Sequence, residues 1–223
     1  MTKNETLRQL LATVPLFTDL DDEILAAIEK ISNRRTLSKG SLLFAEGDIA
    51  ESMYVLIEGR LRCFSSADTG KEFVFYVATA GTSFGEMALI DEEPRSLSID
   101  AAEDCQLLSI SKTSFLELLE KTPLLNNNLL RNMIRYNRYL ANMVKSLALK
   151  DVYGRMRLLL ENLAIDVNGR RYIEDALSQQ AIADRVGSSR EMIAKLMREL
   201  VFGNYIRIEN RRIELLQKLP EHF

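Results

Sequence analysis

The sequence predicts an α+β chain that consists of an antiparallel β-roll, one long helix and a C-terminal helix-turn-helix with a β-hairpin wing. Short β-rich runs separated by glycines occupy residues 36–111, and no glycine or proline interrupts the segment between Pro123 and about Lys150. Two short helical patterns then flank Gly187, and an alternating segment follows at 205–216. We therefore expect three parts: 1–122, the roll with flanking helices; 123–149, the long helix; and 150–223, the winged helix-turn-helix.

The composition allows two hydrophobic cores and limits the partners of the chain. The chain has 223 residues, of which 47% are hydrophobic, and its net charge is -3. An acidic chain is a poor candidate for coating nucleic acid without selectivity, but a local basic surface can still bind a chosen sequence. Basic residues are concentrated near the C-terminal end, at Arg185, Arg190, Lys195, Arg198, Arg207, Arg211 and Arg212.

Several classes of protein are excluded by the residues that the chain lacks. Cys63 and Cys105 do not have metal-ligand spacing, so we expect two buried thiols in a reducing compartment. The only histidine, His222, lies beside the C-terminus, which argues against haem, metal and histidine-based catalytic sites. No segment has the pattern of a signal peptide or a membrane span. We expect a soluble cytoplasmic protein that has no membrane partner.

The N-terminal segment predicts two helices before the roll. Leu7, Leu10 and Leu11 recur at helical spacing, and a second apolar pattern runs over 21–31. Asp21 is placed to cap the second helix.

Short strands with glycine corners predict a closed or rolled sheet. A single flat sheet would leave many strand edges unpaired, so an antiparallel roll is the simplest arrangement. The predicted strands are 41–44, 53–57, 61–64, 73–77 and 107–110, and the predicted corners are Gly40, Gly47, Gly59, Gly70 and Gly81.

The long helix carries an apolar pattern that repeats every seven residues. Such a repeat is typical of a parallel two-stranded dimer, and an asparagine within it can fix the register by pairing with its symmetry mate. Packing of this helix on the sheet of its own chain is the alternative. The two sets of seam positions are Leu130, Asn137 and Val144, and Met133, Leu140 and Leu147.

Residues 177–197 have the pattern of a helix-turn-helix. Ser178 is placed to cap the first helix, Gly187 allows the turn, and Ser188 or Ser189 begins the second helix. Buried positions are expected at Ala181, Ile182, Val186, Ile193, Leu196 and Met197, and outward positions at Arg190, Glu191, Met192 and Lys195. Arginine, glutamate and lysine at the start of the second helix are suited to base edges in a major groove. A helical hairpin with a solvated charged face is the alternative.

The chain resembles the cyclic-AMP receptor protein superfamily of Crp/Fnr regulators over nearly its full length, and the helix-turn-helix segment is where the resemblance is most specific. The segment 187–191, Gly-Ser-Ser-Arg-Glu, together with Lys195, is similar to the recognition helix of that receptor. The resemblance implies that Arg190 and Glu191 contact palindromic DNA half-sites similar to TGTGA, with Lys195 in the place of an arginine. It also implies phosphate contacts from Ser178, Gln180 and Ser189, and a roll similar to the cyclic-nucleotide-binding jelly roll.

The segment 84–96 resembles a phosphate-binding cassette. Gly85 permits close backbone approach, and amides near Glu86 can point at an anion. Arg95 can neutralise a cyclic phosphate, Ser96 can donate a hydrogen bond to it, and Glu86 can accept one from a ribose hydroxyl. The expected ligand site is Gly85, Glu86, Met87, Ala88, Arg95 and Ser96.

Two departures from the family pattern leave the effector open. Leu140 and Ala141 align with the threonine and serine that contact adenine in the receptor, and Tyr76 aligns with a small serine. Cyclic AMP, cyclic GMP, another small anion or no ligand are all compatible with the sequence. In the last case Glu86 and Arg95 would pair with each other. The cysteines are too few to hold the iron–sulfur cluster of the oxygen-sensing branch.

The resulting prediction is a homodimeric, sequence-specific regulator in which a small ligand changes DNA affinity through a hinge at 148–152. The alternatives are a constitutive DNA-binding regulator and one gated by a non-nucleotide effector or a protein partner. A phosphodiesterase would need a cluster of metal ligands and a positioned general base, and the sequence offers neither. We therefore do not expect an enzyme. The resemblance implies RNA polymerase as a further partner, through a loop near 167–171.

Overall fold

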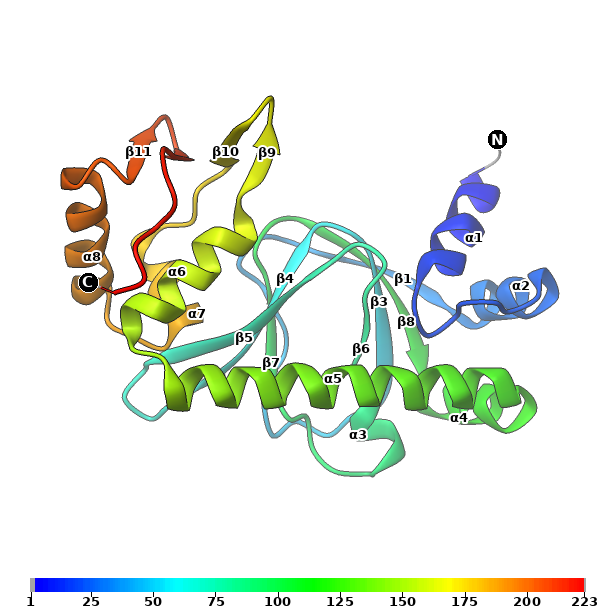
Figure 1. Ribbon diagram of the computed structural model, residues 1–223. Coiled ribbons are helices and arrows are strands. Elements are labelled where there is room, and N and C mark those ends of the chain that lie inside the picture. The colour runs from blue at the N-terminus through cyan, green and yellow to red at the C-terminus, as the bar shows by residue number, and fades with distance from the viewer. Residues whose placement is uncertain (1–2, 223) are drawn as a thin grey trace. The chain divides into compact units, whose positions relative to one another are not determined.

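The structure, a computed structural model, describes residues 3–222, with side chains from Leu7 onward (Figure 1). The chain divides into two compact units. Unit 1 holds the chain up to Ser65 and the segment Val74–Arg138, and unit 2 holds Ser66–Phe73 and the chain from Tyr139 onward. The predicted α+β class with antiparallel sheets, a long helix and a C-terminal helix-turn-helix is confirmed.

Unit 1 contains the predicted roll, formed by two four-stranded antiparallel sheets. The order in one sheet is β1-β8-β3-β6 and in the other β2-β7-β4-β5. The strands are β1 Asn33–Leu37, β2 Leu42–Phe44, β3 Ser52–Glu58, β4 Arg60–Ser66, β5 Glu72–Thr79, β6 Ser83–Phe84, β7 Ser98–Ala101 and β8 Cys105–Ser111. The sequence did not predict β1, β6 and β7, because β6 and β7 are only two and four residues long and four of the five residues of β1 are exposed.

The two faces of β3 and β8 pack into different cores. Alternation along a strand sends neighbouring side chains to opposite faces. Tyr54 and Leu56 therefore join the core within the roll, whereas Met53 and Val55 pack against the helices outside it. The predicted burial of both cysteines is confirmed, and neither forms a disulfide.

The helices of unit 1 cover the outer face of the sheet that contains β3. They are α1 Lys3–Thr13, α2 Asp22–Ile31, the short α3 Met87–Ile90, α4 Lys112–Lys121 and the first part of α5 Pro123–Leu149. The predicted position of Asp21 at the start of α2 is confirmed, but the predicted capping hydrogen bond is absent. Asp21 occupies the N-cap position in an extended conformation, but its side chain accepts no hydrogen bond from the helix. Asp22 and Glu23 place negative charge near the positive end of the helix dipole instead.

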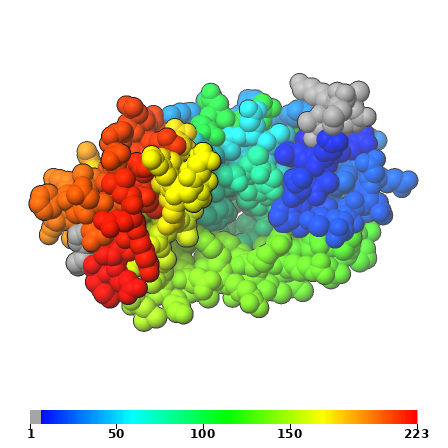
Figure 2. All heavy atoms as spheres, turned by 45° about the horizontal axis from the view of Figure 1, so that its top comes forward, coloured from blue at the N-terminus to red at the C-terminus, as the bar shows by residue number. Residues whose placement is uncertain are grey.

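The long helix α5 has 27 residues and forms one uninterrupted element (Figure 1). Its first turns are anchored in unit 1, where the buried side-chain amide of Asn128 donates to the carbonyls of Leu16 and Thr18 at 3.3 and 2.7 Å. The side chains of α5, green to yellow-green in Figure 2, lie at the molecular surface along much of the helix.

Unit 2 holds the helix-turn-helix on a small four-stranded antiparallel sheet of order β11-β12-β10-β9. Its elements are α6 Val152–Leu163, β9 Ile165–Val167, β10 Arg170–Ile173, α7 Gln179–Val186, α8 Arg190–Phe202, β11 Ile206–Glu209 and β12 Arg212–Leu215. Asn210 and Arg211 turn the predicted wing with φ of 48° and 62°. Among the described residues, no helix is both long and apolar enough to span a membrane.

Candidate ligand pocket and DNA-binding surface

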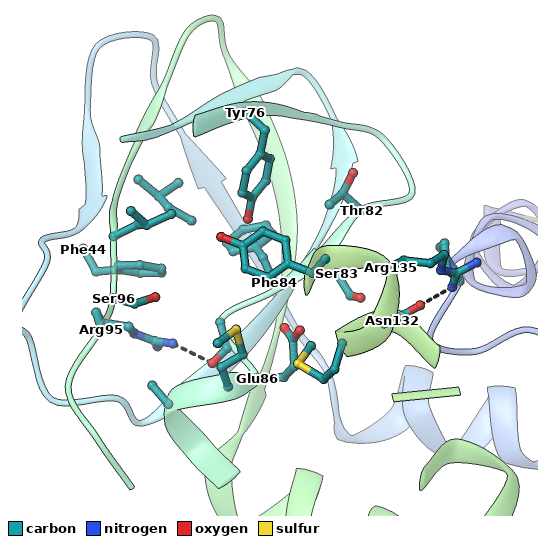
Figure 3. Close-up of a pocket in the computed structure, with 18 of the residues that line it drawn as sticks. Phe44, Tyr76, Thr82, Ser83, Phe84, Glu86, Arg95, Ser96, Asn132 and Arg135 are labelled. Atoms are coloured by element: carbon teal, nitrogen blue, oxygen red, sulfur yellow. Dashed lines mark hydrogen bonds between the residues drawn. The ribbon is translucent and has the colours of Figure 1, made fainter. Parts of the chain in front are cut away.

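A pocket of about 290 Å³ opens in unit 1 beside the segment that resembles a phosphate-binding cassette. All six residues of the expected ligand site line it, and Figure 3 shows Tyr76, Phe84 and Glu86 converging on the cavity. Gly85 has a φ of 82°, and a Cβ added there would lie 2.7 Å from Nη1 of Arg95. Glycine is therefore required at this position for both its backbone angle and its size.

Arg95 is buried against aromatic rings beneath the pocket. Its guanidinium carbon lies 4.2 Å from the ring centre of Phe44 and 5.8 Å from that of Tyr54. Nη1 donates to the carbonyl of Gly85 at 2.7 Å, and Nη2 donates to the carbonyl of Ser52 at 2.5 Å. Nε has no hydrogen-bond partner among the described residues. Burial lowers the pKa of Arg95.

Glu86 is the second buried charged residue of the pocket, with 8% of its surface exposed. Its Oε2 atom has no hydrogen-bond partner within residues 3–222. Burial raises the pKa of Glu86 to about 7. The alternative in which Glu86 and Arg95 pair is not observed, because the Nη atoms of Arg95 are bonded to backbone carbonyls instead.

Helix α5 forms a wall of the pocket that the sequence analysis did not identify. Tyr136 lies edge-on to Tyr76 with ring centres 6.2 Å apart and planes at 76°. Asn132, one helical turn earlier, accepts a hydrogen bond from Arg135 (Figure 3). Burial raises the pKa of Tyr76. The spacing of Asn132 and Tyr136 was the available signal, since side chains four apart share a helix face.

The pocket as described does not include Leu140 or Ala141, which align with the adenine-contacting residues of the receptor. Tyr76 and Tyr136 line it instead, together with the hydroxyl-bearing Thr82 and Ser83. The cavity therefore combines a buried guanidinium and carboxyl with aromatic rings and hydroxyls. Such an arrangement suits an amphipathic anion.

The helix-turn-helix has the predicted caps and turn. The hydroxyl of Ser178 accepts from the amide of Ala181 at 3.1 Å, and that of Ser189 accepts from Met192 at 3.2 Å. Ser189 rather than Ser188 is thus the N-cap of α8. Gly187 ends α7 in the left-handed conformation with φ of 72°. The side chain of Gln180 donates to Asp184 at 2.7 Å, a contact that the sequence analysis missed.

Helix α8 presents charged side chains to solvent at its N-terminal end. Arg190, Glu191 and Lys195 are exposed, and Met192 is 42% exposed. The opposite face is buried in the core of unit 2 through Ile193, Met197 and Leu200, and Leu196 packs against it. Ser178, Gln180 and Ser189 are also exposed. This division leaves the proposed base-contacting residues accessible without loss of the core.

Apolar residues of the α5 seam are exposed in the single chain. Leu130, Val144 and Leu147 are 60%, 65% and 42% exposed, and Asn137 is also exposed. Met133 and Leu140 are partly buried, and Met133 packs against the unit 1 core. An apolar stripe of this length on one helix is typical of a protein interface.

A β-roll with a pocket, a long helix and a helix-turn-helix with exposed charged residues are together typical of sensor-containing transcription regulators. A family model for the cyclic nucleotide-binding domain matches residues 34–122. The cAMP-activated global transcriptional regulator CRP of Pasteurella multocida is 30% identical over 167 residues, which cover 73% of this chain and 79% of the relative. The chain belongs to the Crp/Fnr superfamily of transcription regulators.

Two further proteins extend the match over most of the chain. A CRP-like cAMP-activated global transcriptional regulator of Mycobacterium tuberculosis is 26% identical over 209 residues, 92% of this chain and 93% of the relative. The solved structure of the c-di-GMP responsive global regulator CLP of Xanthomonas campestris has the same fold. It has a TM-score of 0.78 and 22% identity, and the match covers 88% of this chain and all of that one.

Proposed function

We propose that this regulator is a homodimer that binds palindromic DNA and that a cyclic nucleotide in the unit 1 pocket sets its affinity for DNA. The observation that supports a ligand is a pair of buried polar atoms at one cavity, Oε2 of Glu86 and Nε of Arg95, which have no hydrogen-bond partner in the described part of the chain. A buried polar atom without a partner costs free energy, which a ligand that supplies the partner would recover. A ribose hydroxyl and a cyclic phosphate supply those two partners.

The DNA-binding role rests on α8 and the elements around it. Arg190 and Glu191 are exposed at its N-terminal end, where a recognition helix contacts base edges. Arg190 can form two hydrogen bonds with guanine, and Lys195 can reach guanine or phosphate. Ser178, Gln180 and Ser189 are the proposed phosphate contacts. We propose half-sites similar to TGTGA as the target.

The exposed seam of α5 is the proposed dimer interface. A second copy of α5 would cover Leu130, Val144 and Leu147 and would place Asn137 opposite its symmetry mate. In this proposal, residues 1–122 are the sensor, residues 123–149 the dimerisation helix and residues 150–223 the DNA-binding part. We also propose that the protein is cytoplasmic, that RNA polymerase is a further partner and that the protein has no enzymatic activity.

A different effector is the second candidate, because the rings of Tyr76 and Tyr136 meet at the wall of the pocket. A ligand with a different base or a second phosphate would suit this pocket if the two rings separate. The cAMP-activated regulator of Mycobacterium tuberculosis and the c-di-GMP responsive regulator CLP give the two nucleotide classes to compare.

The first experiment is fluorescence anisotropy of a duplex with two TGTGA-like half-sites, with and without cyclic AMP, cyclic GMP or cyclic di-GMP. We expect one nucleotide to tighten binding by at least about tenfold. Arg95→Ala should abolish that response, whereas Arg60→Ala, which removes a surface ion pair with Glu103, should retain it. Tight binding that ignores all three nucleotides would favour constitutive action or another effector.

The same assay tests the DNA contacts. Arg190→Ala should weaken binding by about 1 to 3 kcal/mol and reduce the preference for guanine at its base pair. Arg198→Ala is the matched control, since Arg198 is exposed farther along α8. Equal losses on TGTGA-like and unrelated duplexes would contradict the base-contact assignment.

A further inference from the structure

Phe73, at the start of β5, lies beside the turn that precedes the recognition helix. Residues Ser66–Phe73, the tip of the β4–β5 hairpin, belong to unit 2 together with the helix-turn-helix. A methyl group built on Gly187 would lie 3.3 Å from Cε2 of Phe73 and 3.7 Å from Cδ2 of Leu147. The ring of Phe73 and the side chain of Leu147 at the end of α5 therefore flank the same turn, and the ring leaves little room for a side chain at Gly187.

A third side chain holds the turn from α6. Nε of Arg155 donates to the carbonyl of Val186 at 2.8 Å, and Nη1 donates to the carbonyl of Lys150 at 2.7 Å. Arg155 thus bonds both the residue before Gly187 and the residue that follows α5. Two residues after Gly187, Ser189 caps α8 and Arg190 begins it. A shift of this turn would displace the end of α8 that carries the proposed base contacts.

Strand β5 links this contact covalently to the ligand pocket. Tyr76 lines the pocket only three residues after Phe73. Because side chains alternate along a strand, Phe73 and Tyr76 point to opposite faces of β5. A ligand that moves Tyr76 away from Tyr136 therefore acts on the strand that also carries Phe73.

We infer that Phe73 is a positioning residue for the recognition helix: its ring sets the turn at Gly187 and transmits occupancy of the pocket through β5. The inference rests on the proposed function for its ligand and DNA, but the Phe73–Gly187 contact can be tested without either. Phe73 has no proposed contact with ligand or DNA.

The direct test is hydrogen–deuterium exchange of the full-length protein. In the wild type, the amides of Gly187 and Ser188 both donate to Ala183 at 2.9 and 3.0 Å. Phe73→Ala should raise exchange of these amides by at least about tenfold and leave the β11–β12 hairpin unchanged. Phe73→Leu, which keeps an apolar side chain, should restore most of the protection. Unchanged exchange at 187–188 in Phe73→Ala would overturn the inference.

A double-mutant cycle tests whether the ring and the turn interact. Gly187→Ala strains a backbone at φ of 72° in any background, but only in the presence of Phe73 does its methyl group meet the ring at 3.3 Å. We therefore expect the two substitutions together to increase exchange by less than the product of the single effects. Independent effects would show that the ring does not constrain the turn.

The DNA assay distinguishes this inference from the proposed function. If cyclic AMP tightens wild-type binding to the TGTGA-like duplex, Phe73→Ala should bring the ratio of the two DNA affinities towards one, with cyclic AMP affinity within about twofold of wild type. A retained ratio would overturn the transmitting role. If the wild type binds no duplex, the proposed function fails, and the exchange measurements alone decide whether Phe73 holds the turn.

Discussion

Glu86 and Arg95 lie on one pocket but are accommodated by different interactions. The Arg95 guanidinium has the face of Phe44 and two backbone carbonyls, which offset part of the cost of burying a cation. Oε2 of Glu86 has no such partner among the described residues. The ionised form of Glu86 is therefore the less stable one in the unliganded pocket.

This difference predicts a pH-dependent stability that originates at one residue. The pKa of Glu86 rises from 4.5 to about 7 on folding. Between these values the folded protein keeps a proton that the unfolded chain releases, so the free energy of unfolding falls as pH rises and is lowest above pH 7. Glu86→Gln should remove this decline and stabilise the unliganded protein by roughly 3 kcal/mol at pH 8.

Urea unfolding at pH 5 and pH 8, monitored by circular dichroism, measures the effect. Glu93→Gln is the matched control, because Glu93 lies on the same segment with an exposed side chain. It should leave the difference between the two pH values as in the wild type. An equal decline in Glu86→Gln would mean that another group causes it.

At the scale of the element, α5 changes character along its length. Its beginning is fixed by buried Leu125, Asn128 and Leu129, whereas Leu130 and Val144 expose apolar surface. A helix of this kind gains its stability from packing against its own unit at one end and, in our proposal, against a second copy along the rest.

Val144→Glu should weaken the proposed dimer by more than about a hundredfold, because a symmetric interface buries the substituted residue twice. Lys145→Glu changes charge at the neighbouring exposed position outside the seam and should have little effect. Sedimentation equilibrium measures both dissociation constants. A wild-type monomer would contradict the proposed homodimer, and a dimer whose dissociation constant is unchanged by Val144→Glu would place the interface elsewhere.

At the scale of the whole molecule, the pocket lies in unit 1 and the recognition helix in unit 2. The chain connects them covalently through α5 and through β5. A ligand shifts the balance between two arrangements only by the difference in its affinity for them. The hinge proposed at 148–152 contains Lys150, whose carbonyl accepts a hydrogen bond from Arg155 of α6.

Thermodynamic linkage then makes a reciprocal prediction. If a nucleotide raises DNA affinity by some factor, saturating DNA must raise nucleotide affinity by the same factor. Isothermal titration of the nucleotide into the free protein and into its complex with the TGTGA-like duplex measures that factor. Poly-anionic competitor DNA of unrelated sequence is the control for non-specific charge effects. Different factors in the two directions would contradict a simple ligand–DNA coupling.

The local signals in the sequence were sufficient for the elements whose structure depends on neighbouring residues. The caps at Ser178 and Ser189, the turn at Gly187 and the wing all follow from short-range hydrogen bonds and backbone angles. The cassette was equally visible, because Gly85 through Ser96 form one continuous segment. Asp21 takes the predicted N-cap position of α2, but its side chain does not form the expected capping hydrogen bond.

Only the tertiary structure decided which distant residues meet. It placed Tyr136 of α5 beside Tyr76 of β5, bonded Arg95 to the carbonyl of Ser52 rather than to Glu86, and brought Phe73 to the turn at Gly187. The sequence by itself determined the elements, their order and the chemical character of the two candidate sites. It could not determine these contacts, because each depends on how segments far apart in the chain pack, and such packing leaves no fixed spacing in the sequence.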